Sequence, residues 1–111
     1  MTEQMFRDMF ETKAKYHEIL VLEVKLYEAK IPHTFNTYMG GWRIAYPNNE
    51  KTICSAIEHN GSYGREDDKI EIMGLLTEEE SKCDGVVGWL TAEDVFNRIK
   101  KHYEEHKNVD L

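Results

Sequence analysis

The sequence predicts one α+β domain over residues 1–111: a four-stranded antiparallel meander sheet flanked by a long N-terminal helix and a C-terminal helix, in the order α-β-β-β-β-α. Three observations support this prediction. Residues 2–30 contain no glycine or proline and repeat apolar side chains at helical spacing. Short alternating segments follow between turn residues, and a helix-capping pattern comes after residue 90. We expect both helices to pack on one face of the sheet.

The first helix is expected over residues 2–30, and Pro32 ends it because proline cannot donate the next backbone hydrogen bond. Its apolar residues form two rows. The first row contains Met5, Phe6, Met9, Phe10, Tyr16, Leu20, Val24, Tyr27 and Ile31. The second contains Ile19, Leu22, Leu26 and Ala29. The second row packs either against another copy of the chain, forming a homo-oligomer, or inside the monomer.

Four segments are predicted to be strands. Residues 33–39 and 42–46 form a hairpin, because Gly40 and Gly41 supply the positive φ angles that a tight turn needs. Residues 52–58 and 69–75 alternate in polarity and complete the meander. Residues 77–85 form a polar loop, and residues 86–89 form a short apolar link or a strand.

The C-terminal helix has the clearest boundary in the chain. Thr91 is placed to cap it, Asp94 stands at its third position, and Leu90 can contact Val95 across the cap. The expected buried stripe is Val95, Phe96, Ile99 and Tyr103. The side chains expected to face water are Arg98, Lys100, Lys101, Glu104 and Lys107.

Charge is concentrated in one part of the chain. The formal net charge is −7, from 14 Lys and Arg against 21 Asp and Glu, which disfavours direct binding to nucleic acid or to an anionic membrane. Residues 58–85 hold nine acidic and three basic residues, a net charge of −6. They form either two solvated loops or an acidic face for a basic protein partner. The candidate partner-binding residues are Glu66, Asp67, Asp68, Glu78, Glu79 and Glu80.

The loop before the fourth strand is a candidate ligand site. Its two glycines free the backbone to turn N–H groups toward one point, and nearby side chains offer hydrogen bonds, a stacking ring and a guanidinium. The candidate ligand-binding residues are His59, Asn60, Ser62, Tyr63 and Arg65, alone or with a neighbouring subunit. The alternative is a long hairpin loop with no ligand.

His102, Glu105 and His106 match the spacing of the His-x-x-Glu-His zinc peptidases. That chemistry needs a third protein ligand from a later helix, and five residues follow His106. We therefore expect no catalytic residue, no metal and no cofactor, and a metal enzyme remains the third hypothesis. Cys54 and Cys83 lack metal-binding spacing and are expected to be reduced thiols in a cytoplasmic protein without a membrane span.

Several segments together resemble a group of small uncharacterised proteins that phages and prophages of Gram-positive bacteria encode. They cover roughly residues 20–100 and comprise Ile31-Pro32-His33, Gly41-Trp42 with residues 43–47, Gly61-Ser62-Tyr63-Gly64 with residues 70–75, and residues 86–96. The resemblance implies an accessory protein of phage–host conflict and transfers no catalytic residue.

The leading expectation is a non-enzymatic binding protein in the cytoplasm of the bacterial host. It would inhibit a host defence protein through the acidic face. The alternative expectation is a small-ligand receptor or sponge that uses residues 59–65.

Overall fold

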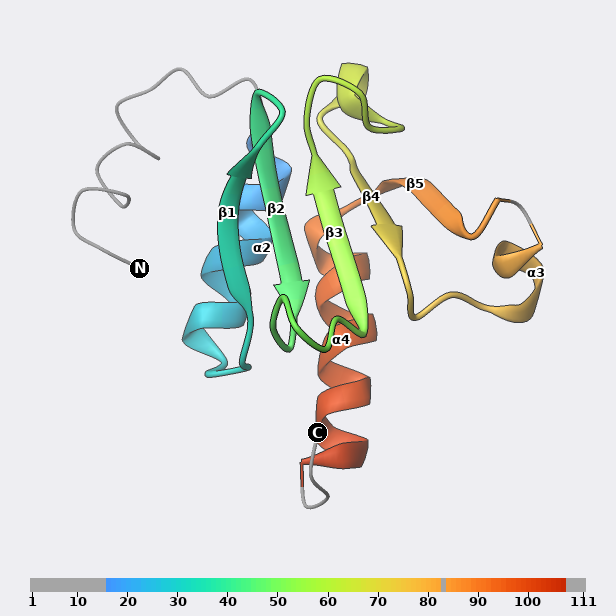
Figure 1. The fold of residues 1–111 in the computed structure, drawn as a ribbon. Helices are drawn as coiled ribbons and strands as arrows, with labels where there is room; N and C mark the ends of the chain where they lie inside the picture. Colours follow the sequence, from blue (N-terminus) through green and yellow to red (C-terminus); the bar gives the residue numbers. More distant parts are fainter. Residues whose placement is uncertain (1–15, 83, 108–111) are drawn as a thin grey trace.

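The computed structural model describes residues 16–82 and 84–107. Within them, five strands form one antiparallel sheet in the order β1-β2-β3-β4-β5. Helices α2 and α4 lie against each other on one face of this sheet (Figure 1). The α+β class is therefore confirmed. The elements are α2 (Glu18–Glu28), β1 (Thr34–Tyr38), β2 (Gly41–Tyr46), β3 (Cys54–Glu58), the 3-10 helix η1 (Arg65–Asp67), β4 (Ile70–Met73), α3 (Glu78–Ser81), β5 (Val86–Leu90) and α4 (Ala92–His106).

The sheet has a fifth strand, so the predicted count of four is wrong. In β5, Val86 pairs with Met73 and Val87 pairs with Ile72, while the register shifts between Ile70 and Ile72. This irregularity is typical of a β-bulge, which interrupts the alternation that identifies a strand in a sequence. The sequence of residues 86–89 alone therefore does not distinguish a strand from an apolar link.

A short helix, α3, lies in the segment that was predicted to be a polar loop. Thr77 Oγ1 accepts a hydrogen bond from the Glu80 N–H, and the Glu80 carboxylate accepts one from the Thr77 N–H. This reciprocal capping box stabilises one helical turn. No residue of α3 is buried, which is why the segment carries no apolar period in the sequence.

Helix α2 begins at Glu18, so the predicted continuous helix over residues 2–30 is wrong at residues 16 and 17. Asp68 Oδ1 accepts hydrogen bonds from the backbone N–H groups of His17 and Glu18, at 2.8 and 3.0 Å. A carboxylate distant in the chain thus caps the helix. The predicted apolar residues Met5, Phe6, Met9 and Phe10 lie outside the described residues.

The second apolar row of this helix lies inside the monomer. Ile19, Leu22 and Leu26 are fully buried in the hydrophobic core, and only Ala29 of the row is exposed. The expectation that a second copy packs on this row is corrected, because α2 contacts α4, β2 and β3 of its own chain. The buried residues of both rows therefore belong to one hydrophobic core, which α2 forms with the sheet and with α4.

The C-terminal helix follows its prediction closely. Thr91 and Asp94 form the expected capping box, and Val95 and Ile99 are fully buried. Phe96 and Tyr103 are partly buried against the same core. One expectation is corrected: Arg98 is half-buried, because it reaches back to the segment after β4. No helix within residues 16–82 and 84–107 is long and apolar enough to cross a bilayer.

The two capping boxes predict different stability effects. Thr91→Ala should lower the free energy of unfolding by about 1 kcal/mol, because it removes the cap of a helix that is packed in the core. Thr77→Ala should cost less, because α3 buries no side chain and can open locally. Urea unfolding of both variants measures the difference. Equal losses would contradict this assignment of the two helices.

Candidate functional site

The loop between β3 and β4 is held together by its own polar groups. Ser62 is fully buried, and its Oγ accepts from the His59 N–H at 3.0 Å and donates to the His59 carbonyl at 3.1 Å. His59 Nδ1 accepts from the Gly61 N–H at 2.9 Å. Arg65 Nη1 donates to the Ser62 carbonyl at 2.9 Å. These groups stabilise the turn from within.

The two remaining candidate residues of this loop are Asn60 and Tyr63. Asn60 Oδ1 accepts from the Tyr16 hydroxyl at 2.5 Å, which ties the loop to the residues before α2. The Tyr63 ring is 51% exposed. The side chains of four of the five predicted ligand-binding residues therefore form hydrogen bonds in the fold, and among the five only the Tyr63 ring remains largely free to meet another molecule.

Tyr63 stacks on a residue that the sequence did not mark. Its ring lies 6.1 Å from that of Trp89, centroid to centroid, with an angle of 17° between the planes. Trp89 is 55% exposed, and its Nε1 donates to Asp67 Oδ2 at 3.1 Å. We call Tyr63 and Trp89 the aromatic platform. Large stacked rings at the surface, with a carboxylate orienting one of them, are typical of a contact surface rather than of a loop without a role.

The aromatic platform requires two glycines. A Cβ at Gly88 would lie 2.5 Å from Tyr63 Cβ, and a Cβ at Gly64 would lie 2.9 Å from the Trp89 backbone nitrogen. Trp89 itself has a φ of +56°, in the left-handed region. Such a conformation costs roughly 1–2 kcal/mol for a residue with a side chain, and strained residues cluster at functional sites.

The first acidic cluster, Glu66, Asp67 and Asp68, does not act as one surface. Glu66 is exposed and pairs with Arg65 at 3.3 Å. Asp67 holds Trp89, while Asp68 caps α2. Another carboxylate joins this region, because Glu71 accepts from the Tyr63 N–H at 2.9 Å. The carboxylates of Asp67 and Glu71 therefore lie beside the aromatic platform, and Asp68 contributes to the fold instead.

The second acidic cluster, Glu78, Glu79 and Glu80, is divided in the same way. Glu80 binds the Arg98 guanidinium with both carboxylate oxygens, each at 2.8 Å. The hydrogen bond from Arg98, with that from the Thr77 N–H, lowers the pKa of Glu80 to about 2. Glu78 and Glu79 are exposed.

The two acidic clusters lie at opposite ends of β4 (Figure 1). The six candidate acidic residues therefore form two separate clusters rather than one face, because the strand lies between η1 and α3. Among the six candidate residues, Asp68 caps α2 and Glu80 pairs with Arg98, so these two stabilise the fold. Of the two clusters, only the first adjoins the aromatic platform, through Asp67.

Glu58 is an acidic residue that the sequence placed in the charged segment, yet it is 0% exposed. Its Oε1 accepts from the Ile19 N–H at 3.1 Å, while its buried Oε2 has no hydrogen-bond partner among the described residues. Burial, with a contribution from the Asp68 carboxylate, raises the pKa of Glu58 to about 9. Glu58 is therefore neutral at pH 7. Eight charged acids against three bases leave residues 58–85 at −5 rather than −6.

Asp68 takes the opposite charge state. Burial alone would raise the pKa of Asp68, but the neighbouring Glu58 carboxyl and the N–H groups of Glu18 and His17 lower it. The positive end of α2 thus stabilises one carboxylate, and the second carboxyl keeps its proton.

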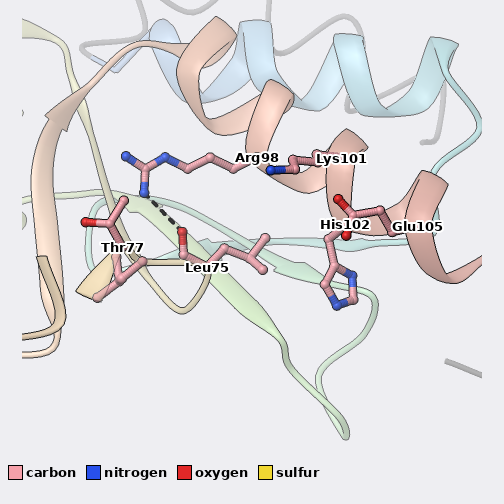
Figure 2. Close-up of a pocket in the computed structure, with 7 residues that line it drawn as sticks. Leu75, Thr77, Arg98, Lys101, His102 and Glu105 are labelled. Atoms are coloured by element: carbon pink, nitrogen blue, oxygen red, sulfur yellow. Dashed lines mark hydrogen bonds between the residues drawn. The ribbon is translucent and has the colours of Figure 1, made fainter. Parts of the chain in front are cut away.

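A groove of about 410 Å³ lies between α4 and the segment that follows β4 (Figure 2). It is lined by Leu75, Leu76, Thr77, Arg98, Lys101, His102 and Glu105, and we call it the α4 groove. His102 Nδ1 and the Tyr46 hydroxyl are 2.7 Å apart. A zinc pattern in the sequence points to His102 and Glu105, but nothing in the sequence points to the two leucines that line the groove with them.

The zinc pattern does not form a metal centre in the described part of the chain. His106 Nδ1 is bonded to the His102 carbonyl at 2.8 Å, and the two rings stack at 4.1 Å. Within residues 16–82 and 84–107, no three His, Cys, Asp or Glu side chains are grouped to hold a metal ion. Burial raises the pKa of Cys54 to about 12, so this thiol is a packing residue. Cys83 lies outside the described residues.

Comparison of the chain with protein-family models, with curated proteins and with solved structures finds no match.

The charge state of Glu58 predicts a pH-dependent stability. The folded protein keeps the Glu58 proton up to about pH 9, whereas the unfolded chain releases it near the ordinary pKa of 4.5. Between these values the unfolded state binds fewer protons, so this group makes the protein less stable as the pH rises. Glu58→Gln, which resembles the neutral acid, should raise the free energy of unfolding at pH 7 by on the order of 1–3 kcal/mol.

The effect of Glu58→Gln should vanish near pH 4, where both states of the wild type carry the proton. Urea unfolding from pH 4 to pH 8 measures it, and Glu71→Gln serves as a partly exposed control in the next strand. A stability difference that does not change with pH would contradict the neutral Glu58.

Proposed function

We propose that the protein is a non-enzymatic accessory binding protein of a phage or prophage, and that its aromatic platform contacts a host protein. The observation that carries the proposal is the exposed, stacked pair of Tyr63 and Trp89. Tyrosine and tryptophan provide much of the binding energy of protein interfaces, since they bury a large area with few rotatable bonds. The phage context comes from the sequence resemblance alone.

The charges beside the platform favour a basic partner. Glu66 and Asp67 belong to the 3-10 helix next to Trp89, and Glu71 lies beside Tyr63. An Arg or Lys side chain of the partner would meet both a ring face and a carboxylate at this point. Negative charge also speeds the encounter with a positively charged surface.

In this proposal, only the acidic residues at one end of β4 contact the partner. Glu78 and Glu79 lie beyond the other end of β4, so they are not part of the same contact. In this proposal the partner is a host protein, such as a component of a defence system, that is blocked by occupation of its basic surface. The place of action is the host cytoplasm.

The experiment is capture of the partner from a lysate of the bacterium that carries the gene. Trp89→Ala and Tyr63→Ala should each reduce the captured protein by at least about tenfold, because each removes half of the platform. The matched control is Tyr27→Ala, an aromatic residue on α2 that is 58% exposed. It should leave capture unchanged.

Charge reversal separates the two acidic clusters. Glu66→Lys should weaken capture, whereas a double variant with Glu78→Lys and Glu79→Lys should not. Circular dichroism of each variant checks that the fold is retained. Capture that survives both platform variants but is lost on reversal of Glu78 and Glu79 would overturn the proposal.

A further inference from the structure

We propose that the α4 groove binds a small zwitterion with an apolar body, the chemistry of a free apolar α-amino acid. This site is separate from the aromatic platform and from the residues 59–65 that the sequence singled out. Its volume of about 410 Å³ falls within the range of small-molecule sites. Three features of the groove determine the ligand: two unpaired opposite charges, one oriented imidazole ring and an apolar floor.

The two charges come from successive turns of α4. Lys101 and Glu105 are both exposed, and neither forms an ion pair with another described residue. They stand four residues apart, but lysine preceding glutamate is the weaker order for a pair along a helix. A ligand with a carboxylate and an ammonium group on neighbouring atoms can pair with both side chains at once.

The third polar group of the groove is the imidazole of His102, which lines it together with Lys101 and Glu105. Its Nδ1 shares a hydrogen bond with the Tyr46 hydroxyl at 2.7 Å, and this bond fixes the orientation of the ring. Burial and the nearby His106 lower the pKa of His102, which favours the neutral imidazole. The other ring nitrogen, Nε2, has no hydrogen-bond partner among the described residues. In one tautomer it can donate to the ligand carboxylate, and in the other it can accept from the ligand ammonium group.

The floor is apolar and fixed in shape. Leu75 and Leu76 are half-buried in the groove, and Leu75 has a φ of +56° after Gly74 at +94°. A Cβ at Gly74 would lie 2.0 Å from the Ile53 carbonyl oxygen, so the chain can take this path only with glycine there. Arg98 Nη1 donates to the Leu75 carbonyl at 3.0 Å and holds the strained turn (Figure 2). An apolar side chain of the ligand finds this surface already formed.

The remaining charges argue against a phosphate ligand. Both carboxylate oxygens of Glu80 pair with Arg98, so the Arg98 guanidinium stabilises the wall of the groove and is not free to pair with a ligand anion. Lys101 is then the one unpaired cation among the described lining residues, and Glu105 would repel a multiply charged anion. The balance of one positive and one negative charge fits a zwitterion.

The test is an NMR titration of the full chain with L-leucine at pH 7, observed through backbone amides and the His102 ring. We expect saturable shifts at Leu76, Lys101 and His102. N-acetyl-leucine lacks the ammonium group and leucine amide lacks the carboxylate, so each should bind roughly tenfold more weakly than leucine. Lys101→Gln and Glu105→Gln should each weaken leucine binding by about tenfold for the same reason.

The matched controls are Lys100→Gln and Glu104→Gln, which change the same residue types on the same helix outside the groove. They should leave leucine binding unchanged. The proposal is overturned if leucine produces no saturable shift at the groove, if leucine amide binds as well as leucine, or if the control variants weaken binding equally.

Discussion

The carboxyl groups of Asp68 and Glu58 both lie at the N-terminus of α2. The arrangement of the remaining elements depends on which of the two carries the negative charge there. Asp68 accepts from the N–H groups of His17 and Glu18, and Glu58 accepts from that of Ile19. Glu58 is fully buried while Asp68 is partly exposed, so Asp68 is ionised and Glu58 keeps its proton. Strand β3, the start of β4 and helix α2 are thereby joined at one point. Glu18 extends the connection to α4, because its carboxylate accepts from the Ala92 N–H at 2.5 Å.

The surface features follow from this fixed point. With Asp68 held at α2, the loop before it can direct its polar groups inward and present the Tyr63 ring outward. Gly64 lies close to the Trp89 backbone and Gly88 lies close to Tyr63, which places Trp89 beside Tyr63 at the cost of a strained backbone at Trp89. At the other end of β4, Arg98 holds a second strained turn and lines the α4 groove, and Glu80 pairs with Arg98. Both proposed binding surfaces therefore contain a residue with a strained backbone, Trp89 in one and Leu75 in the other. Favourable interactions in other parts of the fold must offset the free-energy cost of that strain.

The sequence predicts those elements that depend on residues adjacent in the chain. The hairpin around Gly40 and the cap at Thr91 depend on neighbouring residues, and both are present. One detail of the hairpin prediction is wrong: its two turn residues are Met39 and Gly40, with φ angles of +48° and +79°, while Gly41 already belongs to β2. The start of α2 was not predictable, because its cap comes from a residue fifty positions away. Alternation along β3 already placed position 58 on the face of Cys54 and Ala56, but its glutamate was counted with the exposed acids because charge alone does not reveal burial. The platform was missed because Trp89 meets Tyr63 only after β5 pairs with β4.

The most direct test of this account is a carbon-13 NMR titration of the carboxyl groups in the folded protein. The sharing of the α2 N-terminus predicts that the Glu58 carboxyl titrates at about pH 9 and that Asp68 titrates below its ordinary value of 3.8. The Trp89 indole N–H donates to Asp67, which adjoins Asp68, so its signal should remain constant until Glu58 ionises. A Glu58 midpoint near the ordinary value of 4.5 would contradict the account, because both carboxylates would then be charged at one helix end.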